Sequence, residues 1–135
     1  MSETWGTISA AIQAIFQTGW GSASSVAYPD QPYTPTAGTN WVRLTVKPGA
    51  SEQKTMAAPG RRMWRQYGVL MLQIFTPIHH GDAGVLSLVE TAAAIFRGKT
   101  IGAIQFMAPS FAYPGSSGGW NQANVTVPFK WDEFF

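Results

Sequence analysis

Two stretches of the chain place apolar residues at the spacing of an amphipathic helix. The first begins after Ser2, its expected N-cap, and stops at Gly19. Its apolar side chains recur every three or four positions and share one face, formed by Trp5, Ile8, Ile12, Ile15 and Phe16. The second begins after Asp82 as its cap and stops at Arg97-Gly98, with a buried stripe of Val85, Leu88, Val89, Ala92, Ile95 and Phe96. The pattern predicts two helices, each with one face in the core.

Residues 41–47 and 63–76 have the patterns of two strands. Polar and apolar positions alternate in residues 41–47, which predicts a half-buried strand that ends at Pro48-Gly49 and has one apolar face, made by Val42, Leu44 and Val46. Residues 63–76 are rich in aromatic and branched side chains on both faces. They predict a central strand that is covered on two sides and stopped by Pro77.

The C-terminal part of the chain predicts two further strands. Residues 101–107 form a short one, and residues 123–131 form the last one, whose inward face carries Val125, Val127, Phe129 and Trp131. Pro128 has no N–H to donate to a strand ladder. The last strand is therefore expected to lie at a sheet edge or to be locally unpaired at Pro128.

Three segments rich in Pro, Gly and small residues separate these elements. Residues 29–40 carry Pro29, Pro32, Pro35 and Gly38 and predict an extended connector. Residues 49–60 and 109–119 predict loops. A long structureless loop inside one compact domain is unusual and often functional, so both of these loops are candidate docking segments.

The predicted order is helix, strand, long loop, strand, helix, strand, strand. The simplest architecture is a single α+β domain over residues 1–135, with one mostly antiparallel sheet, two helices packed on one face, and a long loop or hairpin extension. A chain of 135 residues is long enough to bury a core without help from a metal or a disulfide.

The composition indicates that part of the surface meets another protein. Charged residues make up 12% of the chain, against about 25% in ordinary soluble domains, and there are six Trp, four Tyr and eight Phe. The net charge of +2 supplies no basic stripe of the kind a dedicated nucleic-acid binder needs. The absence of Cys excludes disulfides, Cys–Zn sites and thiol catalysis. No apolar run is long enough to span a membrane, and the N-terminus does not have the pattern of a signal peptide, so no membrane partner is expected.

Two short motifs resemble catalytic loops but lie in the wrong context. Residues 115–119 match G-x-S-x-G, but a nucleophile elbow lies between a strand and a helix, whereas Pro114 precedes this motif and a strand is predicted to follow it. Residues 98–100, Gly-Lys-Thr, close a helix instead of opening one. A phosphate loop needs the N–H groups of a helix N-terminus. Neither motif predicts an active site.

The titratable residues also predict no catalytic, cofactor-binding or metal site. His79 and His80 are adjacent, and neighbouring side chains diverge, so they are interpreted as turn residues before a helix cap. The acids are scattered apart from Asp132 and Glu133, and no pair has the arrangement of a glycosidase or a two-metal site. We therefore expect a protein that is not an enzyme and that has no cofactor.

The one concentration of charge is the group Arg61, Arg62 and Arg65 with Trp64. Arg and Trp are favoured at protein interfaces, so a contact patch is the preferred interpretation. A solvated strand end and a nucleic-acid site remain alternatives. Together with their place in or beside the long loop, this predicts that subunit or partner contacts are made by Glu52, Lys54, Arg61, Arg62, Trp64 and Arg65.

Four segments resemble the tail terminator, or tail completion, proteins of long-tailed bacteriophages, including the lambda type. They are residues 26–35 (Val-Ala-Tyr-Pro-Asp-Gln-Pro-Tyr-Thr-Pro), 41–49 (Trp-Val-Arg-Leu-Thr-Val-Lys-Pro-Gly), 67–77 (Tyr-Gly-Val-Leu-Met-Leu-Gln-Ile-Phe-Thr-Pro, with Gly81 following) and 127–129 (Val-Pro-Phe). In combination, the first three segments are fairly specific for this family. When the helix predicted between the strands is included, the resemblance covers nearly the whole chain.

The resemblance implies a structural part of the phage tail. Such proteins are small α+β subunits that close into a ring, commonly a hexamer, on the head-proximal end of the tail tube. The ring stops tube growth and offers the surface that joins the head, while DNA passes through a central channel with few basic side chains. The implied partners are further copies of the chain, the tail tube protein, a head-completion or connector protein and the tape measure protein. The implied location is the virion tail, assembled in the host cytoplasm. Another head–tail connector or tail tube component with a similar fold is the alternative.

Overall fold

The computed structural model describes residues 4–21, 24–28, 34, 39–77, 83–117 and 119–134. Along the chain, its elements are α1 (Trp5–Trp20), β1 (Ser25–Ala27), β2 (Trp41–Gln53), β3 (Met63–Pro77), α2 (Ala83–Phe96), β4 (Thr100–Ile101), β5 (Ile104–Phe106), β6 (Ser110–Ser117) and β7 (Trp120–Phe134). The expected caps Ser2 and Asp82, the His79-His80 pair and most of the connector at 29–40 lie outside the described residues.

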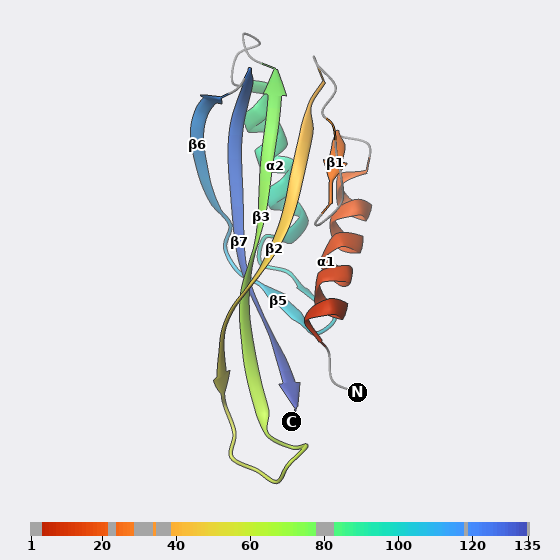
Figure 1. Ribbon diagram of the computed structural model, residues 1–135, viewed down its shortest axis with the longest axis vertical. Helices are drawn as coiled ribbons and strands as arrows, with labels where there is room; N and C mark the ends of the chain where they lie inside the picture. Colours follow the sequence, from red (N-terminus) through yellow and green to blue (C-terminus); the bar gives the residue numbers. More distant parts are fainter. Residues whose placement is uncertain are drawn as a thin grey trace.

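The strands form one curled sheet with two helices on one side, as Figure 1 shows. The strand order is β1-β2-β3-β7-β5-β4, and β6 pairs with β7 on the same side as β5. β1 runs parallel to β2, whereas every other pair of described strands is antiparallel. The α+β prediction is therefore confirmed in outline, but the sheet is mixed, because the short strand β1 was not foreseen.

The core lies between the helices and one face of the sheet. Alternate residues of β3 and β7, such as Leu72 and Val125, point into it and are fully buried. The helices contribute their apolar stripes, and the ring of Phe16 on α1 stacks on that of Phe96 on α2 at 6.3 Å. Full burial of one such side chain stabilises the fold by about 1.5–3 kcal/mol. The predicted helix faces are therefore the ones that fold against the sheet.

Helix α1 begins and ends at other residues than predicted. Thr4 is its N-cap: the Thr7 N–H donates to Thr4 Oγ1 at 3.2 Å, and the Thr4 N–H donates to Thr7 Oγ1 at 2.9 Å. The helix runs through Gly19 and ends at Trp20, with Gly21 as its C-cap, whose φ of 59° suits a residue without Cβ. At Gly19, which is still helical, a Cβ would lie 2.9 Å from Ile95 Cγ1, so the close packing of Ile95 on α1 favours a residue without a side chain there.

The C-terminal strands are more extensive than predicted. The expected strand at 101–107 is a hairpin of β4 and β5, turned at Gly102 with a φ of 59°. The expected loop at 109–119 is mostly the strand β6, which pairs with β7. Pro128 does not lie in an edge strand, because β7 has β3 on one side and β6 and β5 on the other. It lies where β7 changes partner from β6 to β5, and its carbonyl accepts the Met107 N–H at 2.9 Å. The N–H that Pro128 lacks would lie at this change of partner, so its absence removes no hydrogen bond between paired strands.

Candidate functional site

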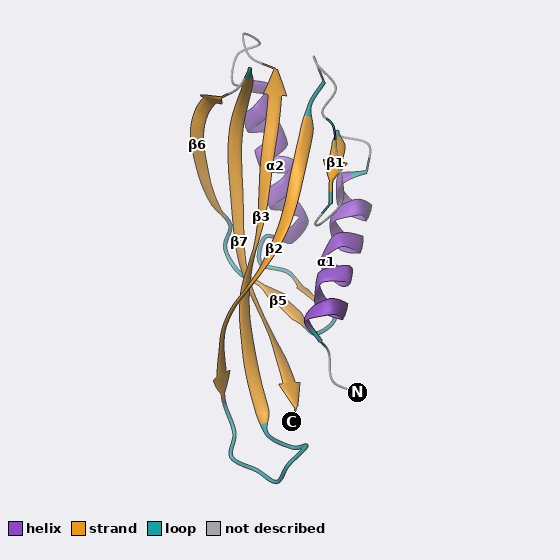
Figure 2. Cartoon of the chain, viewed as in Figure 1, coloured by secondary structure: helices purple, strands orange, loops and turns teal. Residues whose placement is uncertain are grey.

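A hairpin arm extends from one end of the sheet (Figure 2). It comprises residues 48–66 of β2, β3 and the loop between them, together with residues 131–134 of β7, and residues 54–62 form its tip. The register shift between Pro48 and Ser51 is a bulge that lets β2 pass Pro48 and continue. The prediction that the strand ends at Pro48-Gly49 is therefore wrong, as is the prediction that residues 49–60 are all a structureless loop. The alternative, a hairpin extension, is confirmed.

The tip of the arm is a defined loop. The Met63 N–H donates to Thr55 Oγ1 at 2.8 Å. The Arg61 N–H donates to the Ala58 carbonyl at 2.9 Å and closes a turn in which Gly60 has a φ of 86°. Pro followed by Gly at the centre of such a turn is the signature of type II. The sequence Pro59-Gly60 thus reverses the chain at the end of the segment 49–60 that was predicted to be a loop.

Glu52 and Lys54 form an ion pair on the arm. Lys54 Nζ lies 2.9 Å from Glu52 Oε1, and the Tyr67 hydroxyl donates to Glu52 Oε2 at 3.4 Å. The hydrogen bond from Lys54, followed by its charge, lowers the pKa of Glu52 below 4.5. The same hydrogen bond raises the pKa of Lys54 above 10.5. Each predicted contact residue therefore holds the other in its charged form.

Arg65 is paired across the arm. Arg65 Nε donates to Asp132 Oδ1 at 2.9 Å, and this hydrogen bond raises the pKa of Arg65. Glu52, Arg65 and Asp132 occupy one rung of the three strands. Sequence reasoning noted Asp132 only as an acid near the C-terminus. The signal that could have found its role is the opposite charge on the facing strand.

The predicted cluster of Arg61, Arg62, Trp64 and Arg65 is divided by the structure. Trp64 and Arg65 are adjacent in β3, so their side chains leave opposite faces of the arm. Arg61 and Arg62 lie in the tip, where Arg62 Nε donates to the Ala57 carbonyl at 3.2 Å. The six predicted contact residues thus all lie on the arm, but they do not form one patch.

On β3, the sheet face turned away from the helices is half-buried, and the register places Arg43, Lys47 and Lys130 of the neighbouring strands on the same face. On β3 it comprises Tyr67, Val69, Met71, Gln73 and Phe75. At one end, the rings of Trp41 and Phe75 stack at 4.1 Å, with Trp120 edge-on to Trp41 at 6.1 Å. Both helices cover the opposite face of β3, and no described element of the same chain covers this one. The prediction that residues 63–76 are covered on two sides is therefore wrong for a single chain.

Two long strand edges have no partner among the described residues. β1 covers β2 only as far as Arg43, so the rest of β2 has an open outer edge. On the opposite side of the sheet, β6 pairs only with β7, and its outer edge carries Phe111 and Tyr113, which are 50% and 43% exposed. Open edges with apolar side chains are sites where another chain can add.

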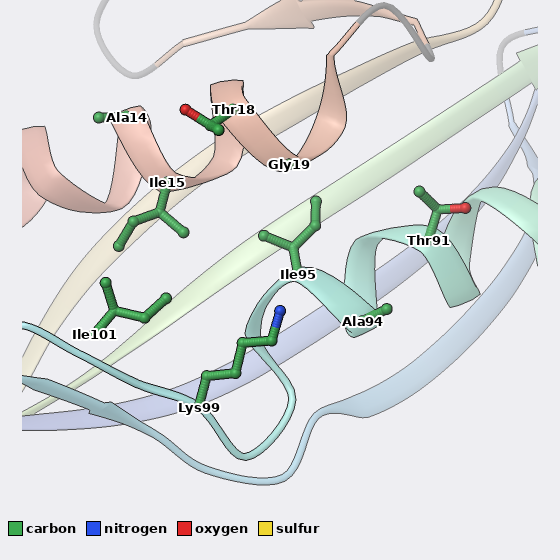
Figure 3. Close-up of a pocket in the computed structure, with 9 residues that line it drawn as sticks. All are labelled: Ala14, Ile15, Thr18, Gly19, Thr91, Ala94, Ile95, Lys99 and Ile101. Atoms are coloured by element: carbon green, nitrogen blue, oxygen red, sulfur yellow. The ribbon is translucent and has the colours of Figure 1, made fainter.

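An apolar groove lies on the helix layer (Figure 3). It has a volume of about 730 Å³, and its lining includes Ala14, Ile15 and Gly19 of α1, Ala94 and Ile95 of α2, and Ile101. Ile15 and Ile95 approach each other across it, and the Lys99 side chain lies at its side. The two helices contain one charged residue, Glu90, although the outer faces of surface helices are ordinarily charged.

The two short motifs that resemble catalytic loops lie in the wrong local context in the structure as well. Residues 115–117 belong to β6, which leads into β7, so the G-x-S-x-G motif has no helix after it. The Gly-Lys-Thr motif follows the end of α2, and Gly98 has a φ of 63° there. No group of three His, Asp or Glu side chains in the described part could hold a metal ion. None of the described helices has both the length and the hydropathy needed to cross a membrane.

Comparisons with known proteins agree with the resemblance of the four segments. A family model for the phage tail terminator protein matches residues 7–129. No curated protein matches the chain. A solved structure with 19% sequence identity covers 93% of this chain and 96% of its own, with a TM-score of 0.64, which shows a shared fold. Because the family model spans nearly the whole described fold, the chain belongs to the phage tail terminator protein family.

Proposed function

We propose that the chain closes into a hexameric ring on the head-proximal end of the tail tube. Membership of the terminator family gives it a structural role in the phage tail. In this proposal the ring stops elongation of the tube, offers the head-joining surface and leaves a central channel through which DNA passes. The chain performs no catalysis and needs no cofactor.

The observation that carries the proposal is the pair of open edges on opposite sides of one sheet. The edge of β2 in one copy faces the edge of β6 in the next, and the contact is heterologous because the two edges differ. A heterologous contact repeated with a fixed rotation gives a closed ring or an open helix. Burial of Phe111 and Tyr113 would favour this pairing and would account for an aromatic-rich, charge-poor chain.

The arm supplies the further contacts of the ring. Its six predicted residues face the neighbouring copy or the tail tube protein. In this proposal the remaining surfaces of the ring meet a head-completion or connector protein and the tape measure protein. Arg61 and Arg65 test the role of the arm because Arg61 is exposed and Arg65 is partly exposed.

The first experiment is light scattering of the purified chain at several concentrations, followed by electron microscopy with and without tail tubes. The expected result is a particle of about six times the 14.6 kDa subunit mass, seen as a ring, and tubes of fixed length. A chain that stays monomeric even with tubes would refute the proposal. Long polymers of the chain alone would identify a tube component instead.

The second experiment replaces Arg61 and Arg65 with Glu. The expected result is impaired ring closure or impaired capping of tubes, because two positive charges at the contact become negative. Since Arg65 also pairs with Asp132 within the chain, Arg61→Glu alone should change assembly in the same direction. A matched control is Arg97→Glu, at an exposed position on the helix side of the molecule. Unchanged assembly of the Arg61→Glu, Arg65→Glu chain would contradict the assignment of the arm to a contact.

A further inference from the structure

The sheet face turned away from the helices carries three cations outside the arm. Arg43 and Lys47 lie on β2 and are exposed, and Lys130 lies on β7 and is half-buried. Directly paired residues of a sheet share a face, and each cation is paired with a residue of β3 on this face: Gln73 for Arg43, Val69 for Lys47 and Tyr67 for Lys130. Both helices cover the opposite face (Figure 1), so the three side chains point away from the core.

No acid of the described residues balances these charges. None of the three cations forms an ion pair within the part of the chain that the structure describes. The Arg43 guanidinium lies 5.3 Å from the centre of the Trp41 ring, a contact that leaves its N–H groups free to donate to an acceptor. Described acids reach this face only on the arm, where Lys54 and Arg65 pair with them. Outside the arm, the face therefore presents positive charge alone.

Several neutral residues between the cations can also donate hydrogen bonds. On this face they are Thr45, Gln73, Asn124 and Thr126, with Val69 and Met71 among them. Gln122 Nε2 donates to Asn124 Oδ1 at 3.0 Å, which uses the acceptor of Asn124 and leaves its NH2 group to donate. Arg, Lys, Thr, Asn and Gln are the side chains that contact phosphate oxygens of DNA. The face therefore has the chemistry of a surface that binds a polyanion.

We propose that this face lines the channel of the ring and that Arg43, Lys47 and Lys130 contact phosphates of the DNA that passes through it. This inference rests on the proposed ring and names the surface that meets DNA there. DNA is the occupant that the charges favour, because it is the polyanion that the proposed channel admits. The resemblance of the four segments implies a channel with few basic side chains, whereas in this proposal each copy contributes three.

The spacing of the cations suits a DNA duplex. Arg43 and Lys47 are four residues apart on one strand, or about 13 Å. Lys47 and Lys130 are two strands and two residues apart in the register, or about 12 Å. Both spacings are close to the width of the major groove, about 12 Å, which has phosphates along both borders. Contacts to phosphates carry no sequence information and let a protein slide along a duplex, so they do not block passage.

The first test measures the binding of a labelled duplex of arbitrary sequence to rings of the full chain, by fluorescence anisotropy between about 50 and 200 mM salt. Each phosphate contact adds about −0.9 to the slope of log K against log salt. Arg43→Gln with Lys130→Gln removes two of the three contacts, so the slope should fall to about one third of its value in the unmodified chain. Lys47 is kept because it lies on the open edge of β2.

The matched control is Arg97→Gln with Lys99→Gln. It removes one Arg and one Lys from exposed positions on the helix side of the molecule and should leave the slope unchanged. Light scattering of both double variants checks that the rings persist. An equal fall of the slope in both variants would show a general effect of net charge and overturn the inference.

A second measurement places the DNA on this face and uses the absence of Cys from the chain. A photo-cross-linker is attached to one introduced thiol at a time, Gln73→Cys on this face or Ala94→Cys on the helix layer. Cross-links to the duplex are expected from position 73 and not from position 94. Rings that bind no duplex, or that cross-link to it only from position 94, would overturn the inference and leave the ring standing.

Two further outcomes distinguish this inference from its alternatives. Rings that bind polyglutamate through Arg43 and Lys130 more tightly than the duplex at the same salt concentration would assign the face to an acidic protein and overturn the inference. An unmodified chain that never forms rings would refute the proposed function itself.

Discussion

Among the described glycines, Gly68 is the one where we expect an added methyl group to lower the free energy of unfolding most clearly. It lies in β3 on the helix side of the sheet, under the rings of Trp5 and Phe129. A Cβ at Gly68 would lie 2.8 Å from Phe129 Cζ, 2.9 Å from Trp5 Cη2 and 3.0 Å from the Lys47 carbonyl oxygen. Because one of these atoms belongs to the backbone and another to a fully buried ring, the neighbours cannot all move aside cheaply.

Gly68→Ala should therefore destabilise the fold. Overpacking of a well-filled core by one carbon costs about 1–3 kcal/mol. The loss of backbone freedom in the unfolded chain offsets about 0.5–1 kcal/mol of this. The expected net loss in the free energy of unfolding is about 0.5–2 kcal/mol, which lowers the melting temperature of a chain of this length by about 2–8 °C.

The assay is urea unfolding of both chains at one protein concentration, because assembly also shifts apparent stability. Gly84→Ala is the matched control: its Cβ meets nothing within 4 Å in α2, so it should be neutral or slightly stabilising. Trp5→Phe removes the Cη2 atom and should partly rescue Gly68→Ala, with a coupling energy of at least about 0.5 kcal/mol. Equal unfolding midpoints for Gly68→Ala and the unmodified chain, or strictly additive effects with Trp5→Phe, would refute the packing argument.

Two further predictions concern the cap of α1 and the ion pair on the arm. Thr4→Ala should lower the free energy of unfolding by about 1 kcal/mol, because it removes the reciprocal bonds with Thr7; an unfolding midpoint equal to that of the unmodified chain would contradict the capping role. The Glu52 carboxyl should titrate with a midpoint below 4.5, measured by nuclear magnetic resonance, and Lys54→Met should move that midpoint upward. Because the folded pKa is depressed, the ion pair stabilises the arm above the unfolded pKa and is lost as the pH falls through the folded pKa; a midpoint indifferent to Lys54→Met would exclude the pair as its cause.

The helices were predictable because their signal is local. The 3.6-residue period identified the buried stripes of α1 and α2, and Gly98 marked the end of α2. The residues at which α1 begins and ends were predicted wrongly. Thr4 has the same capping chemistry as Ser2, and either glycine near the end, Gly19 or Gly21, could stop a helix, so the local sequence does not decide between them.

A hairpin extension was predicted as one alternative, but the strands at residues 48–53 of the arm and in β6 were missed because they depend on partners distant in the sequence. Pro48-Gly49 interrupts the local strand pattern, but the bulge absorbs it and β3 supplies the hydrogen bonds beyond it. Pro114 and Gly115 likewise lower the strand propensity of β6, which forms against β7 with a register shift at that point. One signal was available for the arm: the strand predicted at 63–76 is longer than 41–47, so its antiparallel neighbour had to continue past Pro48.

The charged residues are distributed unevenly among the elements of the fold. Of the sixteen charged residues, seven lie on the arm: Glu52, Lys54, Arg61, Arg62, Arg65, Asp132 and Glu133. The helices carry only Glu90, and β6 carries no charge. Desolvation of neutral surfaces is cheap, whereas desolvation of unpaired ions is costly. The edge of β6 can therefore be buried between copies at little electrostatic cost, whereas the open edge of β2 carries Lys47 and needs an anionic partner, either an acid on the neighbouring copy or the proposed DNA phosphates.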